Sequence, residues 1–473
     1  MFDRRALLVL VCAACHAGPG ASAGEDAASS DSSSTCGTGS SGSPQVTNLD
    51  DGTQLGYSLA LLSGTAGGTE VSIASAGEVI AWPVVAGHYK ALVPLAAGAN
   101  TVQLTACGHT LALRLAFQPQ TNDYYVRVVY VEGSNGGGTF DAPPGTPNTE
   151  ADGVVRVQTA AWMWQTFYAE AMQRQGFGRT TFRLLLDANQ RPVVTVARST
   201  KTTAQLRAMT PNQIWSQLYT DFGALPNREQ IKDVLILGGV SHFDPATAQL
   251  RAGGALGGGH EAMFHGADLF TWPPSVADVV PHFLDLTKVD ATQLSDDSAG
   301  RHTYWANDTT TSGAVIHELG HTLGFAHNTD YTSIMYRGFD TWNRFFMASE
   351  PASDASPGIP QIADSDLPDA LVDYEAMWLA YSRWFTQVPV ADPGGAVTIT
   401  QSGDTVTVSS PNKLRDIIFW DDNLTFDADE LKTAPPSTKT YSAAQLRVRF
   451  PTATRIGLLV MDGAGKTQSF DVM

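Results

Sequence analysis

The sequence has few charged residues, and most of those it has are acidic. Charged residues make up 16% of the 473 residues, and 29 Lys and Arg stand against 47 Asp and Glu, for a net charge of −18. A negative field of this size repels phosphate backbones and anionic membranes, so the composition argues against a nucleic-acid partner. Beyond the N-terminus, no stretch reaches about 18 uninterrupted apolar residues, the length that a membrane-spanning helix requires.

The chain is nevertheless rich enough in apolar residues to fold. Hydrophobic residues make up 43% of the sequence, which excludes wholesale disorder and allows sizeable cores. The length predicts about three domains. The 44 Gly and 25 Pro are typical of turn-rich β modules rather than of a helical bundle.

Residues 1–23 have the pattern of an export signal. Arg4 and Arg5 form a basic start, and a short apolar run and several small residues follow. The stretch from Cys12 to Cys15 resembles a bacterial lipobox, although Cys12 stands where the box usually has Leu. The sequence therefore predicts an exported protein, either anchored at the cell surface through a lipidated Cys15 or secreted after cleavage at the end of the signal.

Residues 24–45 predict a flexible linker. They are rich in Ser and Gly and contain no Lys or Arg, so they cannot bury enough surface to fold. Cys36 lies in this linker, and an oxidising compartment permits a disulfide with Cys107, the one cysteine of the folded body. In the alternative hypothesis Cys36 is a latency cysteine that ligates a metal, which only the dipeptide Cys36–Gly37 supports.

The body of the chain divides into three parts by its pattern. Residues 46–117 alternate short β-type runs with glycine-containing turns, which predicts a β-sandwich-like module. The same pattern returns over residues 388–473, with Leu446–Phe450 as one of the predicted strands. Residues 118–387 alternate strands with helices, which predicts a layered α/β domain. Its predicted strands are Tyr125–Val131, Phe182–Leu186, Val193–Ala197 and Val234–Val240, and its predicted helices are Val154–Arg174 and Asn212–Phe222.

The strongest functional signal is the motif HExxHxxGxxH between residues 317 and 327. His317 and His321 are four residues apart, so in a helix both imidazoles project from one face and can share a metal ion. Glu318 lies beside the first ligand, where it can hydrogen-bond a metal-bound water rather than the metal itself.

The same motif predicts a third ligand. Gly324 can adopt the left-handed conformation that ends a helix, and the sharp turn lets His327 swing back toward the same ion. Three neutral nitrogens and one open position are the coordination of a catalytic rather than a structural zinc. We therefore expect one catalytic Zn²⁺ ion, with another divalent ion as the alternative.

The extended motif resembles the metzincin clan of zinc metalloproteases, in which it is followed by a methionine-containing tight turn beneath the metal. Ser333–Gly338 is the candidate turn here, with Met335 as the Met-turn residue. Ile334–Phe346 further resembles a little-characterised metallopeptidase family known mainly from fungi. The resemblance implies an α/β (α+β) metzincin-like zinc-protease domain with a twisted mixed sheet and an active-site helix, flanked by the two β-sandwich-like modules.

The chain departs from the clan at one position. Some metzincins carry a tyrosine two residues after the turn methionine, where it helps to stabilise the transition state. That position holds Arg337 here, and the tyrosine is Tyr336, one residue earlier. Tyr336 is therefore a candidate transition-state stabiliser whose spacing does not match the clan's pattern.

Two weaker signals lie before the motif. Gly253–Gly259 lacks the Lys-Ser/Thr of a phosphate loop and predicts a flexible loop before a strand at Met263–Phe270. In metzincins an edge strand before the active-site helix pairs with the substrate backbone, and Met263–Phe270 is our candidate for it. His260 and His265 are five residues apart among glycines, a spacing that does not favour a second metal ion.

These signals together predict an exported zinc-dependent endopeptidase that acts on protein or peptide substrates. Glu318 would take a proton from the metal-activated water as general base and return it to the leaving amine. In the alternative hypothesis the protein is a surface binding or adhesion protein whose metalloprotease-like domain lacks significant turnover. The intact Glu318 argues against it, because a non-catalytic domain has no physical need for a base beside the metal.

Overall fold

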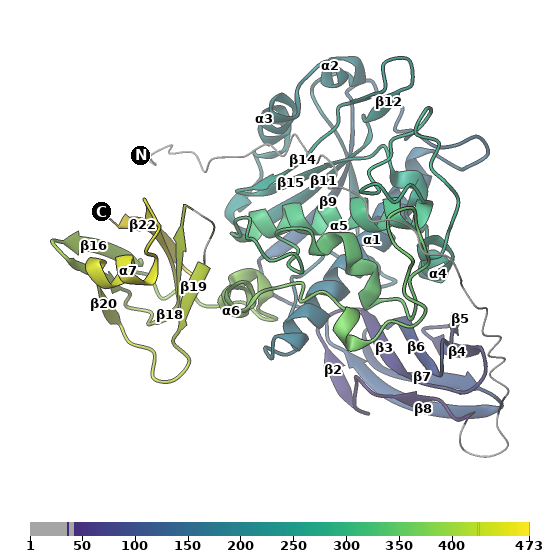
Figure 1. The fold of residues 1–473 in the computed structure, drawn as a ribbon, viewed down its shortest axis with the longest axis horizontal. Coiled ribbons are helices and arrows are strands. Elements are labelled where there is room, and N and C mark those ends of the chain that lie inside the picture. Colours follow the sequence, from purple (N-terminus) through teal and green to yellow (C-terminus); the bar gives the residue numbers. More distant parts are fainter. Residues whose placement is uncertain (1–35, 37–41, 423, 425, 473) are drawn as a thin grey trace.

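The fold consists of an N-terminal pair of sheets, a central α/β region and a C-terminal pair of sheets (Figure 1). The computed structural model describes residue 36 and residues 42–472 except 423 and 425. The predicted export signal with Cys15, and most of the predicted linker, lie outside these residues. Within the described residues, no helix combines the length and apolar character needed to cross a membrane.

The strands of the N-terminal region form two sheets. One sheet has the order β1-β3-β6 and the other the order β2-β8-β7-β4-β5. Along β7 and β8 buried and exposed side chains alternate, because successive residues of a strand point to opposite faces. The strands are β1 (Gln45–Val46), β2 (Thr53–Leu55), β3 (Leu59–Thr65), β4 (Glu70–Ser75), β5 (Glu78–Pro83), β6 (His88–Pro94), β7 (Gly98–Ala106) and β8 (His109–Phe117).

A disulfide ties the start of the described chain to this region. Cys36 is bonded to Cys107, which lies in the turn between β7 and β8. The sulfur of Cys36 is therefore engaged, and the hypothesis that it ligates a metal is wrong. The two alternatives could not be separated by sequence because they require the same residue and differ only in its partner.

The central region is built on a five-stranded sheet of order β10-β9-β11-β15-β14. The first four strands are parallel and β14 is an antiparallel edge strand. Every residue of β11 is buried, as expected for the middle of such a sheet. The strands are β9 (Tyr125–Glu132), β10 (Val194–Arg198), β11 (Ile231–Gly239), β14 (Ala255–Gly258) and β15 (Glu261–His265), and β12 (His242–Asp244) pairs separately with β13 (Gln249–Arg251).

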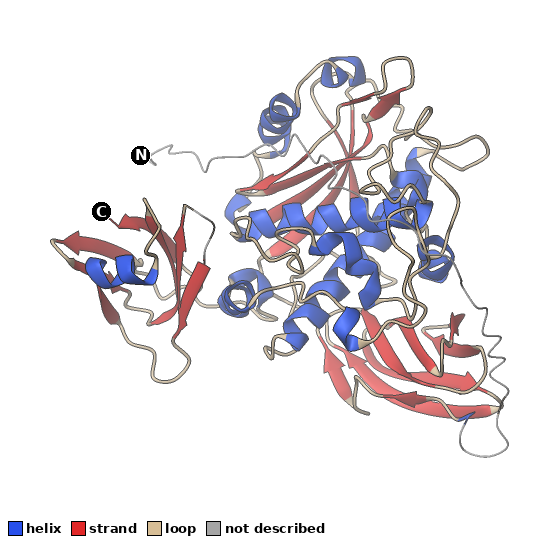
Figure 2. Ribbon diagram, viewed as in Figure 1, coloured by secondary structure: helices blue, strands red, loops and turns tan. Residues whose placement is uncertain are grey.

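Helices cover both faces of this sheet (Figure 2). Val128 of β9 and Val234 of β11 belong to the core that includes α1 and α5, whereas Val129 and Leu235 belong to the core beneath α2 and α3. The helices are α1 (Glu150–Arg174), α2 (Thr203–Arg207), α3 (Pro211–Phe222), α4 (Val279–Phe283), α5 (Tyr304–Leu323) and α6 (Asp373–Tyr381). Short 3₁₀ helices occupy Arg228–Gln230, Leu269–Thr271, Val276–Asp278, Gly338–Phe345, Asp364–Asp366 and Arg383–Phe385.

Three elements away from the sheet edge differ from those expected. Helix α1 begins at Glu150, before the predicted start, because Thr149 and Asp152 form a capping box. Residues 182–186 form no strand and make only isolated bridges through Leu184 and Leu186. Residues 443–449 form helix α7, capped by Ser442, where a strand was expected, because the local cap outweighs the β-type residues that follow it.

The N-terminal sheets share a hydrophobic core with the central region. Thr166 of α1 donates a hydrogen bond to the carbonyl of Leu59 at 2.7 Å, and Trp162 donates its indole N–H to Ser58 at 2.8 Å. Helix α1 thus lies between the central sheet and β3.

The C-terminal region forms two further antiparallel sheets, β16-β17-β20 and β19-β18-β21-β22. It contacts the central region through α6: the ring of Tyr374 stacks on Phe426 at 4.7 Å, and Tyr381 donates a hydrogen bond to Glu430 at 3.1 Å. Its elements are β16 (Thr398–Ser402), β17 (Thr405–Ser409), β18 (Leu414–Asp421), β19 (Phe426–Glu430), β20 (Thr438–Ser442), α7 (Ala443–Arg449), β21 (Ile456–Asp462) and β22 (Thr467–Val472).

The disulfide should contribute to stability, because it closes a loop between residues 71 positions apart. We expect the Cys36→Ser/Cys107→Ser variant to lose about 2–4 kcal/mol of unfolding free energy through the greater entropy of its unfolded chain. Thermal denaturation with and without a thiol reductant measures this. The reductant should lower the melting temperature of the parent protein and leave that of the variant unchanged; equal shifts in both would contradict the prediction.

Candidate metal centre

Helix α5 carries the histidine motif and ends where the motif's glycine stands. Gly324 has φ 109°, a left-handed conformation that a residue with a side chain rarely adopts. The amide of Phe325 then donates a hydrogen bond to the carbonyl of Gly320 at 3.1 Å. The chain leaves the helix through this turn and returns to it at His327.

The three histidines converge on one point. The Nε2 atom of His317 lies 3.1 Å from that of His327 and 3.2 Å from that of His321, and the remaining pair is also 3.2 Å apart. A zinc ion about 2.0–2.1 Å from each of three tetrahedrally arranged nitrogens would hold them about 3.3 Å apart. The residues present therefore fit a tetrahedral zinc ion with one open position.

Backbone carbonyls fix the orientation of two of these rings. The Nδ1 of His317 lies 2.6 Å from the carbonyl oxygen of Ile334, and the Nδ1 of His321 lies 2.8 Å from that of Phe325. A ring that donates Nδ1–H to a carbonyl presents its Nε2 lone pair to the metal. Burial lowers the pKa of His317 well below its ordinary value and that of His321 to about 4, so both rings are neutral, as metal ligands must be.

Met335 lies in a tight turn beside the ligand helix. Ile334 receives a hydrogen bond from His317, and Met335 is fully buried. A Cβ atom on Gly320 would stand 2.4 Å from the sulfur of Met335, so the glycine lets the Met335 side chain lie close against α5. The turn is closed by the amides of Tyr336 and Gly338, which both donate to the carbonyl of Ser333.

A buried carboxyl group from α6 supports this turn. Glu375 accepts a hydrogen bond from the side-chain amide of Asn328 at 2.8 Å and from the hydroxyl of Ser333 at 3.3–3.4 Å. Burial raises the pKa of Glu375 to about 8. No local spacing in the sequence indicates the pairing of Asn328 with Glu375, because 47 positions separate them.

Glu318 directly follows His317 and is 7% exposed. Burial raises its pKa to about 8. Its backbone lies directly against the sheet edge, since a Cβ atom on Gly257 would stand 2.2 Å from the carbonyl oxygen of Glu318.

The glycine-rich run is therefore an ordered strand and not the flexible loop that was expected. Ala255–Gly258 forms β14, the edge of the sheet, and β15 lies inside the sheet between β11 and β14. The expected strand at Met263–Phe270 covers only Glu261–His265 and is not an edge strand. The prediction was wrong because Gly257 serves close approach to α5 rather than flexibility.

Tyr336 and Arg337 have different neighbours. The half-buried ring of Tyr336 packs edge-on against Tyr331 at 4.6 Å. Arg337 lies over the ring of Phe339, which in turn contacts the ring of His317 at 5.4 Å. The residue that stands two positions after Met335 is thus connected to a histidine of the cluster through an aromatic ring.

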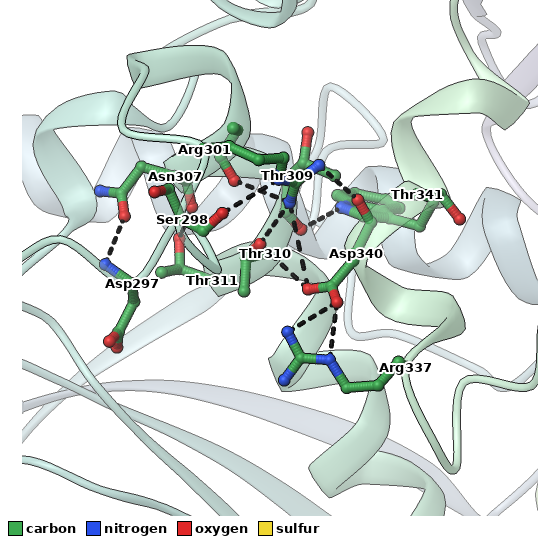
Figure 3. Close-up of polar contacts among 12 residues, drawn as sticks. Asp297, Ser298, Arg301, Asn307, Thr309, Thr310, Thr311, Arg337, Asp340 and Thr341 are labelled. Carbon is green, nitrogen blue, oxygen red and sulfur yellow. Dashed lines mark hydrogen bonds and ion pairs between the residues drawn. The ribbon is translucent and has the colours of Figure 1, made fainter. Parts of the chain in front are cut away.

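A buried polar network holds the segment after the turn against α5 (Figure 3). Arg301 donates to the carbonyl of Asp340 at 2.9 Å and to the hydroxyl of Thr310. The hydroxyl of Thr310 also donates a hydrogen bond to one carboxylate oxygen of Asp340 at 3.1 Å. The other carboxylate oxygen of Asp340 accepts a hydrogen bond from Arg337 at 2.7 Å. Trp342 adds a hydrogen bond from its indole N–H to the carbonyl of Thr309 at 2.9 Å.

The contact between Gly257 and Glu318 can be tested by adding one methyl group. We expect Gly257→Ala to push β14 away from α5, at a cost of about 1–3 kcal/mol in unfolding free energy and with weaker metal binding. Gly259→Asn is the matched control, because Gly259 has φ 55°, which Asn tolerates, and a Cβ there would meet nothing within 4 Å. Denaturant unfolding and metal titration of both variants measure this, and equal behaviour would contradict the prediction.

Comparison with known proteins gives matches at the level of family and of sequence. The model of a family described as "Putative peptidase family" matches residues 43–374 and so includes the N-terminal sheets. A "putative zinc metalloproteinase" of Schizosaccharomyces pombe is 29% identical over 292 residues, 57% of this chain and 46% of that protein. Another protein so named, from Saccharomyces cerevisiae, is 26% identical over 309 residues, 58% of this chain and 44% of that protein.

The matches thus cover less than half the length of these two relatives. Among solved structures, OgpA from Akkermansia muciniphila matches 75% of this chain and 94% of its own, with 16% identity and a TM-score of 0.43. That likeness is too low to bear on function. The family model covers most of the chain, and the chain therefore belongs to this metallopeptidase family.

Proposed function

We propose that this protein is an exported zinc endopeptidase with a metzincin-like catalytic domain. The observation that carries the proposal is the convergence of three histidine nitrogens within 3.2 Å of one another, with the buried Glu318 directly after the first of these histidines in the helix. Catalytic zinc sites use such a set, since three protein ligands leave one position open. In this proposal His317, His321 and His327 hold the ion.

The chemistry divides between the ion and the protein. When bound, zinc lowers the pKa of a coordinated water and polarises the scissile carbonyl. Glu318 accepts a proton from the attacking water and delivers a proton to the leaving amine as the peptide bond breaks. The carbonyls of Ile334 and Phe325 keep the rings of His317 and His321 oriented throughout.

Strand β14 is the proposed docking site for an extended peptide. It forms the outer edge of the described sheet and lies against α5 at Glu318. An edge strand offers backbone N–H and C=O groups to a strand added beside it, so the main chain of an extended peptide can bind there through hydrogen bonds. This proposal moves the role that the sequence suggested for residues 263–270 to residues 255–258.

The finer domain arrangement belongs to the same proposal. Residues 118–387 form the catalytic domain, Met335 is its Met-turn residue, and Tyr336 is a candidate transition-state stabiliser. Residues 46–117 and 388–473 form β-sandwich-like modules beside it. The disulfide between Cys36 and Cys107 supports export, because such bonds persist in oxidising compartments.

The role of Glu318 is tested by Glu318→Gln, which removes the base and keeps its shape. We expect the variant to bind zinc like the parent protein and to lose about 10²–10⁴-fold in hydrolysis of a peptide library, as for loss of a general base. Metal content by mass spectrometry and cleavage by chromatography measure the two properties. The control is Glu229→Gln, an exposed residue outside the proposed site, which should leave both unchanged.

Each other outcome has a definite meaning. Full activity in the zinc-loaded Glu318→Gln protein would remove Glu318 from the mechanism. Zinc in parent and variant without cleavage by either would overturn the peptidase in favour of a binding protein. A parent protein that holds no metal would contradict the zinc site itself.

A further inference from the structure

A second group of metal-ligating side chains lies at the opposite end of α5 from the histidine motif. His265 is the last residue of β15, Asp268 follows it, and Asp297 lies in the loop before α5. One ligand atom from each lies within 4.8 Å of the others. The nearby Asn307 precedes His317 by ten residues, about 15 Å along the helix axis, so this group is separate from the three-histidine cluster.

The side chain of His265 lies between two carboxylates. Its Nε2 is 2.8 Å from an oxygen of Asp297, and its Nδ1 is 3.3 Å from Oδ2 of Asp268. His265 and Asp268 have side chains that are only 3% and 1% exposed, whereas the side chain of Asp297 is half exposed. The group therefore extends from the protein interior to the surface.

Two atoms in this group have no hydrogen-bond partner among the described residues. They are Nδ1 of His265 and Oδ2 of Asp268, which lie 3.3 Å apart with no hydrogen bond between them. A buried polar atom left in this way costs about 1–3 kcal/mol, so native structures rarely contain one without a ligand, a water or an ion. Both atoms are among the kinds that bind metals.

The other atoms of the group are already held in place. Asn307 of α5 donates its side-chain amide to Oδ1 of Asp268 at 2.9 Å and accepts the backbone N–H of Asp297 at 2.8 Å, the second of which Figure 3 shows. Asn307 thus fixes the carboxylate of Asp268 so that its other oxygen, Oδ2, remains beside His265. The group is positioned before any ligand arrives.

Negative charge exceeds positive charge around His265. Asp268, Asp297 and the neighbouring Asp296 act on one another, and Asp296 is paired with His302. Arg337 also acts on Asp297 from the segment after the Met-containing turn.

We propose that His265 and Asp268 bind a second divalent transition-metal ion, with Asp297 supporting the histidine from the other side. Zinc binds imidazole nitrogen and carboxylate oxygen at about 2.0–2.2 Å, which places two such ligands about 3.3 Å apart around a tetrahedral ion. The separation of Nδ1 and Oδ2 is 3.3 Å. A mixed nitrogen and oxygen set favours zinc over calcium or magnesium, which prefer oxygen alone.

Asp297 has the place of a supporting carboxylate. Metal-binding histidines almost always donate their other ring N–H to a carboxylate, a carbonyl or a water, which fixes the tautomer. Asp297 would accept Nε2–H of His265 in this way and leave Nδ1 for the ion.

An ion at this site would join three segments: the end of β15, the loop that carries Asp297 and the first turns of α5, through Asn307. Its role would be structural, since it would hold the helix that bears the three-histidine cluster against the sheet. The inference does not depend on peptide hydrolysis. Sequence spacing did not connect Asp297 to this group, because it lies 32 positions after His265.

The test counts the zinc ions bound by the full chain, with the three-histidine cluster (the first site) intact or removed. We expect two zinc ions in the parent protein and one in His317→Ala/His321→Ala, measured by mass spectrometry after equilibration with zinc chloride and dialysis. Adding Asp268→Asn, which keeps the shape of the side chain, should remove the remaining ion. Adding Asp297→Asn instead should weaken zinc binding about 10–100-fold in calorimetric titration, as for other supporting carboxylates.

His88→Ala is the matched control, because His88 is exposed and lies in β6 of the N-terminal region. It should leave both ions in place. A first-site variant that binds no zinc would overturn the proposal, and this result requires no substitution in the second site. A proton would then occupy the place of the ion, and ¹⁵N spectra of His265 would show N–H at both ring nitrogens.

Discussion

The close approach of α5 to its neighbours is the constraint on which the rest of the central region depends. Gly257 of β14 meets the backbone of Glu318, and Gly320 of α5 meets the sulfur of Met335, each at a distance that leaves no room for a Cβ atom. These contacts fix the positions of helix α5, the edge strand β14 and the turn at Met335 relative to one another. The three histidines converge because the chain leaves α5 at Gly324 and returns within this rigid frame.

Hydrogen bonds orient the histidine rings within this packed frame. The carbonyls of Ile334 and Phe325 bind the Nδ1 atoms of His317 and His321, so the Nε2 atoms of both rings point to a common centre. Glu375 stabilises the turn that supplies the first carbonyl. Orientation of ligands by groups outside the site is a general requirement of metal centres, and the same logic links Asp297 to His265.

Much of the central fold could be predicted from pattern alone. Strands β9 and β11 and helices α1 and α3 lie close to the predicted ranges, because each has a strong period or a continuous apolar run. The strands predicted at Phe182–Leu186 and Leu446–Phe450 were wrong, since a short apolar run does not distinguish a strand from other structure. The predicted edge strand was wrong because a glycine can permit close approach as well as flexibility. Only the neighbouring segment of the folded chain shows which of the two applies.

The sequence by itself determined the candidate ligands: the spacing of His317, Glu318, His321 and Gly324 encodes local geometry within one helix and its end. It also indicated two partners for Cys36 without choosing between them. Only the tertiary structure decided that Cys36 pairs with Cys107, that β14 is the edge strand beside Glu318, and that His265 meets Asp268 and Asp297. The reason is physical: periodicity reports what lies on one face of one element, whereas contacts between distant segments arise from packing.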